Sequence, residues 1–373
     1  MKLTYLACSA AIAMAAAMPL RAQDGTEWQT IDAYRIGQID PHALVVPYKA
    51  GDVKAVSEMQ YDKSPYYMDL NGKWKFKWTK NPANRPAGFQ APEYDVTAWD
   101  DINVPGNWER QGYGTAVYTN TTYEFDSEWA GFKKNWPKVP EATNEVGSYR
   151  RSFTVPADWE GRRVVLCLEG AISFYYVWVN GEYLGCNMGS KTAAEWDITD
   201  KLRKGENSVS LEVYRWSAGA YFECQDFWRL SGIERDVYLY STPTTYIADF
   251  TARTPLDATY TDGKFDLQVT VDGLPTVKAS SKVKSAPAKV KYAIYDAAGK
   301  LVTEDEKAAA HNTFFDATLP AVNKWSAESP YLYTLLVDLL DASGKVMETV
   351  GSNIGFKTSE VKNGFFMVNG APV

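Results

Sequence analysis

The order of polar and apolar residues along the chain predicts many short β-strands and no long helix. Residues 73–78 read Lys-Trp-Lys-Phe-Lys-Trp, an alternation of period two that is typical of a strand with one buried face. The apolar run 174–179 ends in Asn180-Gly181, which predicts a tight hairpin and a return strand at 183–185. Other strands of this first block are expected at 148–155, 163–169, 207–216 and 237–240, with one helical turn at 197–202.

After residue 242 the aromatic density falls and a second block of strands begins. About seven short strands in about 110 residues suit an immunoglobulin-like sandwich, although the Cys…Trp…Cys signature is missing. Residues 276–289 are rich in Lys, Ser, Ala and Pro and are expected to form a mobile, solvated connection. The strands of this block are expected at 265–271, 290–295, 313–319, 331–340 and 346–354, with turns at 296–299 and 341–344.

The predicted fold class is therefore all-β, with two sandwiches in series. Residues 23–44 have little periodicity and are expected to be an extended lead-in that wraps the first sandwich. A jelly roll is expected at 45–242 and an immunoglobulin-like β-sandwich at 243–357. Residues 358–373 hold an apolar strand, an Asn-Gly turn and the start of another strand, a pattern that stops midway.

The first 22 residues are typical of an export signal. Lys2 gives a positive start, residues 3–18 are apolar and rich in Ala, and Ala22 ends a plausible cleavage site. The sequence thus predicts a signal peptide at 1–22 and a secreted or periplasmic protein. The apolar run is too short for a membrane span, and no later run of 18 apolar residues predicts one.

Composition and motifs exclude several classes of function. A net charge of -7 without a basic run disfavours nucleic acid as a partner. No C-x-x-C pair occurs, and His42 and His311 are the only histidines, which excludes the usual zinc sites and a Ser-His-Asp triad. Cys167, Cys186 and Cys224 remain after cleavage, so one disulfide can form and at least one thiol stays free.

Two segments, 117–123 and 221–233, set polar residues among aromatic rings. The amide of Asn120 and the carboxylate of Asp226 suit sugar hydroxyls, because both make directional hydrogen bonds while rings exclude water. The alternative is structural: Asp226 pairs with Arg229 or caps a turn, and Asn120 holds a loop.

Much of the chain beyond the signal peptide resembles glycoside hydrolase family 2, and specifically its β-galactosidase branch. The W-S-A-E-x-P stretch and the C-terminal hinge are common to the family, whereas Y-T-N and Q-D-x-W-R-x-S-G-I are specific to β-galactosidases. The matching segments are DPHALVVPY (40–48), LNGKWKFKW (70–78), VPGNWERQGYGTAVYTNTTY (104–123), VWVNGEYLG (177–185), RWSAGAYFECQDFWRLSGI (215–233), WSAESPYLYTL (325–335) and IGFKTSEVKNGFFMVNGAP (354–372).

The resemblance implies roles for two residues of this chain. Asn120 matches the asparagine that reaches from the sugar-binding domain to the galactosyl unit. Asp226 matches the aspartate that contacts galactose hydroxyls and helps to bind sodium in some members. Cys224 stands where some relatives have an acidic residue, which weakens any statement about local charge. The catalytic nucleophile, the acid/base glutamate and the magnesium ligands of the family lie in its (β/α)₈ barrel, so no catalytic residue is expected in this chain.

The resemblance implies that this chain is the N-terminal part of a retaining β-galactosidase, and that it ends at the start of the catalytic barrel. The full-length enzyme would hydrolyse terminal β-galactosides, and this chain would contribute walls of the substrate pocket. Its partner would be a galactoside or oligosaccharide. Magnesium, sodium and homo-oligomerisation would belong to the full-length enzyme. Two alternatives stay open: a free-standing carbohydrate-binding module or lectin, and another family 2 specificity such as β-glucuronidase or β-mannosidase.

Overall fold

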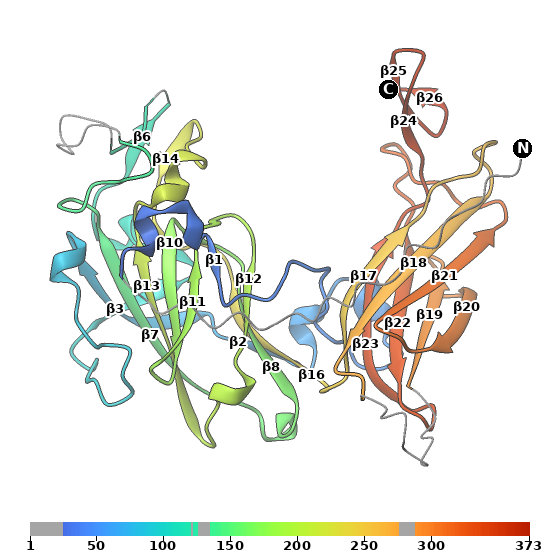
Figure 1. Cartoon of the computed structure of the whole chain (residues 1–373). Helices are drawn as coiled ribbons and strands as arrows, with labels where there is room; N and C mark the ends of the chain where they lie inside the picture. The colour runs from blue at the N-terminus through green and yellow to red at the C-terminus, as the bar shows by residue number, and fades with distance from the viewer. Residues whose placement is uncertain (1–24, 121, 126–134, 276–287) are drawn as a thin grey trace, which may run out of the picture.

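The computed structural model describes residues 25–120, 122–125, 135–275 and 288–373, and folds them into two β-sandwiches side by side (Figure 1). The predicted signal peptide and nearly all of the predicted 276–289 connection lie outside these residues. Within them the structure is nearly all strand, with one short α-helix, α1 (Val53–Ser57). The all-β prediction is confirmed.

The first sandwich pairs a seven-stranded sheet, in the order β1-β11-β10-β13-β7-β3-β4, with a four-stranded sheet, in the order β12-β8-β16-β2. The predicted hairpin is present, and Asn180 and Gly181 both have positive φ in its turn. The strands are β1 (Arg35–Ile36), β2 (Tyr67–Asp69), β3 (Gly72–Thr79), β4 (Asp100–Val104), β7 (Val146–Thr154), β8 (Arg163–Leu168), β10 (Phe174–Val179), β11 (Glu182–Asn187), β12 (Ala194–Asp197), β13 (Glu206–Tyr214) and β16 (Val237–Thr242).

Strand β10 is apolar throughout because both of its faces are buried. Alternate side chains of a strand point to opposite faces, so one half enters the sandwich interior and the other half a second core on the outer face. The interior set is Tyr175, Val177 and Val179, and the outer set is Phe174, Tyr176 and Trp178. Two short 3-10 helices of the lead-in, η1 (Glu27–Gln29) and η2 (Ile31–Ala33), cover the outer set through Trp28 and Ala33.

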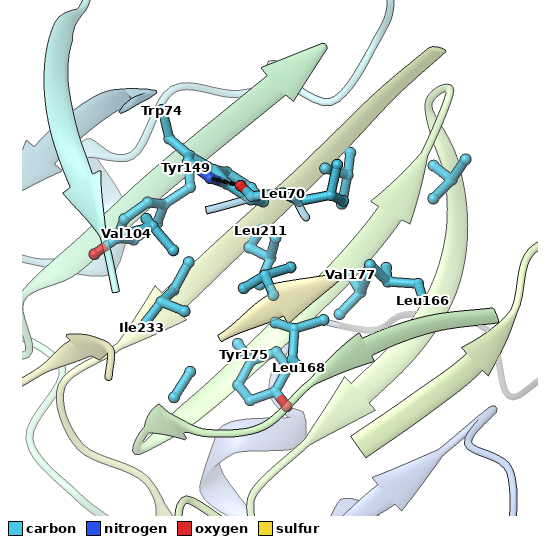
Figure 2. Close-up of a cluster of buried hydrophobic side chains, with 14 of the residues drawn as sticks. Leu70, Trp74, Val104, Tyr149, Leu166, Leu168, Tyr175, Val177, Leu211 and Ile233 are labelled. Atoms are coloured by element: carbon cyan, nitrogen blue, oxygen red, sulfur yellow. Dashed lines mark hydrogen bonds between the residues drawn. The ribbon is translucent and has the colours of Figure 1, made fainter. Parts of the chain in front are cut away.

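The sandwich interior is filled by large side chains from both sheets (Figure 2). Trp74 and Tyr149 of the large sheet lie near Leu70, whose carbonyl accepts a 2.8 Å hydrogen bond from the Trp74 indole. Leu166 and Leu168 enter from the small sheet. A buried indole needs such a partner, since an unpaired donor costs about 1–3 kcal/mol.

The second sandwich packs the sheet β17-β18-β21 against the sheet β20-β19-β22-β23. Two of its strands are absent from the sequence prediction. Strand β20 is almost wholly exposed, so it shows no apolar alternation, and β17 begins where the sequence predicts only a change of block. The strands are β17 (Tyr246–Arg253), β18 (Gly263–Asp272), β19 (Lys289–Tyr295), β20 (Leu301–Ala308), β21 (Asn312–Leu319), β22 (Tyr333–Leu340) and β23 (Val346–Ile354).

The two sandwiches share one apolar core. The outward residues of β8 and β16 join the interior of the second sandwich, with Val45 and Val46 of the incoming chain between them. Tyr48 donates its backbone N–H to the Thr349 carbonyl at 2.7 Å, which fixes this segment to β23. The outward residues of the small sheet are Val165, Cys167, Tyr238 and Tyr240.

The remaining elements are short. Beyond the second sandwich the chain forms a small antiparallel sheet of β24 (Ser359–Lys362), β25 (Phe365–Val368) and β26 (Ala371–Pro372). The 3-10 helices of the first sandwich include η3 (Tyr61–Lys63), η4 (Pro82–Asn84), η5 (Glu109–Gln111), η7 (Ala157–Trp159), η8 (Thr199–Lys201) and η9 (Ala218–Tyr221), of which η8 is the predicted helical turn. A further small sheet joins β5 (Gly106–Asn107), β15 (Gly232–Ile233) and β9 (Ala171–Ile172).

No helix in the described part of the chain is long and apolar enough to cross a membrane. Cys167, Cys186 and Cys224 are all free thiols, and the first two are buried. Burial raises the pKa of the Cys167 thiol well above its ordinary value, which keeps it protonated and unreactive.

Glu348 lies at the junction of the two sandwiches and gives a test of their packing. Its buried carboxyl accepts a 2.7 Å hydrogen bond from the backbone N–H of Ile247, and burial raises its pKa from 4.5 to about 8. Between these two pH values the folded protein holds a proton that the unfolded chain has lost, so this group makes the free energy of unfolding fall as pH rises.

We expect Glu348→Gln to remove this pH dependence, because glutamine keeps the acceptor oxygen and carries no charge. Relative to the wild type, the variant should gain about 1.4 kcal/mol of stability for each pH unit inside that window. Urea unfolding at pH 5, 6, 7 and 8 measures the difference. A constant difference across the series would show that Glu348 ionises normally in the folded protein.

Candidate functional site

A two-stranded finger projects from one end of the first sandwich (Figure 1). It consists of β6 (Val117–Thr119) and β14 (Phe227–Arg229), which pair antiparallel with Tyr118 opposite Trp228. The two strands come from the two segments in which the sequence sets polar residues among rings. In the view of Figure 1 the finger points to the same side of the molecule as β24–β26.

The register of this finger brings the two predicted site residues together. Thr119 is opposite Phe227, so one step further along the same register places Asn120 opposite Asp226. The two residues are 106 positions apart in the sequence, and both are exposed. Because facing residues of an antiparallel pair share a side of the sheet, the amide and the carboxylate lie on one face of the tip.

The same face carries two exposed aromatic residues, Tyr118 and Trp228, whose ring centroids are 5.9 Å apart. The Tyr118 hydroxyl donates a 2.5 Å hydrogen bond to Oδ1 of Asp226. That bond raises the pKa of Tyr118 and holds the carboxylate beside the rings. These aromatic residues are not among the predicted site residues, although both stand in the two segments that the sequence analysis selects.

The alternative in which Asp226 pairs with Arg229 is wrong. Arg229 lies on the other face of the finger, where its guanidinium donates to the Thr119 carbonyl at 3.3 Å and contacts the Cys224 sulfur at 3.0 Å. Asp226 is exposed and bonded to Tyr118 instead. Its carboxylate is therefore available to a ligand at the tip.

A cavity of about 50 Å³ lies behind the finger, lined by Glu223, Cys224, Arg229 and several rings. This volume holds a few water molecules, since each needs about 10–15 Å³ on this measure. The Glu223 carboxylate faces inward and accepts a 2.8 Å bond from the Ser190 N–H, and burial raises its pKa. The cavity is therefore of the size of a few waters, and the exposed polar groups of the tip are not among its lining residues.

One prediction for Asp226 concerns a sodium ion. Across the described ranges, no group of three or more His, Cys, Asp or Glu side chains could hold a metal ion. Asp226 offers one carboxylate, of which one oxygen already accepts from Tyr118. The sodium contact that the resemblance implies for Asp226 stays a prediction.

Two β-sandwiches in series, the first with amide, carboxylate and rings on one exposed finger, are the arrangement that the resemblance to glycoside hydrolases implies. Family profiles agree: the sugar-binding domain of glycosyl hydrolases family 2 matches residues 67–243, and a second profile of family 2 matches residues 245–357. The chain belongs to glycosyl hydrolase family 2.

Curated relatives named β-galactosidase match most of the chain. One from Priestia megaterium is 39% identical over 356 residues, covering 92% of this chain and 33% of its own length. One from Halalkalibacterium halodurans is 34% identical over 354 residues, covering 94% and 33%. The chain thus spans about a third of the length of these relatives.

Solved structures support the fold. A Bifidobacterium dentium β-glucuronidase complexed with coumarin-3-O-glucuronide aligns with a TM-score of 0.63 and 22% identity, covering 82% of this chain and 50% of that chain. A β-glycosidase from Bacteroides vulgatus aligns with a TM-score of 0.62 and 23% identity, covering 82% and 36%.

The exposure of Asp226 predicts how the fold tolerates its loss. We expect Asp226→Ala to change the free energy of unfolding by less than about 0.5 kcal/mol, as for exposed residues in general. Leu211→Ala, in the sandwich interior, is the positive control and should lose about 2–5 kcal/mol. Urea unfolding of both variants measures the contrast. A large loss of stability in Asp226→Ala would restore a structural role for this residue.

Proposed function

We propose that the chain forms one wall of the sugar pocket of a retaining β-galactosidase. The observation that carries the proposal is the register of β6 and β14, which joins Asn120 to Asp226 at one exposed tip. Both residues stand in segments that resemble β-galactosidases specifically. The curated relatives at 32–39% identity support the same specificity.

The tip suits a neutral sugar. The Asp226 carboxylate accepts hydrogen bonds from hydroxyls, and the Asn120 amide can both donate and accept. Tyr118 and Trp228 offer ring faces against which the C–H groups of a sugar can pack. Hydrogen bonds from a charged group to a bound hydroxyl contribute about 1.5–3 kcal/mol.

Cleavage itself is assigned to residues outside this chain. A retaining glycosidase uses two carboxyl groups about 5 Å apart, one as nucleophile and one as acid and then base. The resemblance places both in the barrel of the family. The chain would therefore contribute recognition of the galactosyl unit, while the barrel breaks the bond.

A hybrid enzyme tests this division of labour. In the hybrid, residues 23–373 of this chain replace the matching third of the Priestia megaterium relative. We expect the hybrid to hydrolyse a nitrophenyl β-galactoside in preference to the β-glucuronide and the β-mannoside, and the isolated chain to hydrolyse none. Turnover by the isolated chain that disappears when one of its own carboxylates is mutated would refute the proposal, as would a hybrid that prefers the glucuronide or the mannoside.

In the same hybrid, Asp226→Ala should lower kcat/KM for the galactoside about tenfold to a hundredfold, because a charge-assisted hydrogen bond to the sugar is lost. Asp101→Ala, an exposed carboxylate on β4, is the matched control and should leave kcat/KM unchanged. Equal kinetics in both variants would remove Asp226 from the site.

We also propose that the protein is exported, because Lys2, the Ala-rich run and Ala22 form a signal-peptide pattern. N-terminal sequencing of the protein secreted by its native host should find Gln23 as the first residue. A mature chain that still begins at Met1 would contradict this proposal.

A further inference from the structure

One buried arginine lies at the base of the finger. Arg215 directly follows β13, and its side chain is 2% exposed. The guanidinium pairs with three glutamates at once: Glu145 at 3.0 Å, Glu124 at 3.2 Å and Glu109 at 3.6 Å. These carboxylates come from three separate segments, namely η5, the turn at Glu124 and the residue before β7, so one side chain ties four segments together.

The segment that leads into β6 and the segment that leaves β14 are both bonded to this cluster. Arg215 donates to the carbonyl of Thr115, two residues before β6, at 3.0 Å. The carboxylate of Glu109 accepts from the backbone N–H of Ser231, two residues after β14, at 2.9 Å. Continuing the register of the ladder places Thr115 opposite Ser231, so the cluster holds both segments at the same position along the ladder.

The chain is held a third time where it returns from the tip. Glu124 follows Asn120 by four residues, and it accepts from the Arg215 guanidinium and from the buried Trp216 indole. Three of the chain segments that lead to the tip are therefore bonded to Arg215 or one of its carboxylate partners, and the fourth begins at Arg215 itself and is also bonded to the sandwich through Glu223 and Ser190.

The charged groups of this cluster are better suited to fixing the arrangement of the finger base than to stabilising the fold. Burial works against the charge of Arg215, but Glu124, Glu145 and Glu109 outweigh it and raise the pKa of the guanidinium. Burial also raises the pKa of Glu109 to about 7. Buried ion pairs contribute little net stability compared with apolar residues of the same size, and their best-supported use is to select one arrangement.

We propose that Arg215 is a positioning residue that sets the orientation of the β6–β14 finger, and through it the places of Asn120 and Asp226 in the sugar pocket. This inference rests on the proposed function. Asn120 lies five positions after Thr115, about 16 Å of extended chain, so a tilt of about 4° at the base moves the tip by about 1 Å. A misplacement of that size can cost about a hundredfold in rate.

The test compares two buried arginines. Arg215→Lys keeps the charge and loses the planar fork. Arg150→Lys is the matched control, because Arg150 is also buried and donates to four backbone carbonyls, but all four lie at Phe89, Ala91, Pro92 and Tyr94, away from the finger. Glu124→Gln is a second variant, in case Arg215→Lys does not fold.

The first measurement needs no activity. Hydrogen exchange of the chain should speed up at the amides of 117–119 and 227–229 by about tenfold in Arg215→Lys, with a smaller change in Glu124→Gln, as expected when a local anchor is weakened. In Arg150→Lys the change should be confined to 86–95. Unchanged exchange in the finger of both cluster variants would overturn the proposal, whatever the function of the chain.

The second measurement uses the hybrid enzyme. Arg215→Lys should lower kcat/KM for the galactoside about tenfold, Arg150→Lys should leave it unchanged, and Arg215→Lys combined with Asp226→Ala should lose less than the product of the single effects. An equal loss of kcat/KM in Arg150→Lys, or fully additive effects in the double variant, would show that Arg215 contributes only to the general stability of the fold. Faster exchange in the finger with unchanged kinetics would instead refute the sugar-binding role of the tip.

Discussion

The four-stranded sheet of the first sandwich is apolar on both faces, and the arrangement of the other parts depends on this. Val165 and Cys167 of β8 point away from the sandwich interior that Leu166 and Leu168 help to fill. An outer face of this kind must be covered, because exposed apolar surface costs about 25 cal/mol for each Å². The second sandwich covers it, with the segment around Val45 between the two.

The finger is built on a different principle. It has two strands of three residues each and no buried hydrophobic side chain among them, and an isolated pair of strands of that size is marginal in water. Its orientation depends on Arg215 and the three carboxylates at its base rather than on a packed core. Exposed groups at its tip can therefore serve a ligand while the sandwich supplies stability.

Particular residues show what the sequence could predict. Strands such as β3 and β10 are recognisable because alternation or a continuous apolar run records their burial. Strand β20 is missed because almost all of its side chains are exposed, so its sequence shows no alternation of apolar and polar residues. Asn120 and Asp226 are selected by the motifs around them, but only the register of the finger joins them. Arg215 is not predicted as a site residue because its three partners lie in segments far from it in the sequence, and no local spacing of residues indicates pairing at that range.

The core shared by the two sandwiches also governs how the molecule comes apart. Family profiles divide the chain between residues 243 and 245. Tyr238 and Tyr240 lie before that division and Phe250 after it, yet all three belong to one apolar cluster. Calorimetry should therefore record a single endotherm for both sandwiches, because unfolding either one exposes the apolar face of the other to water. For the same reason, a fragment ended at residue 243 would carry a bare aromatic face and tend to self-associate.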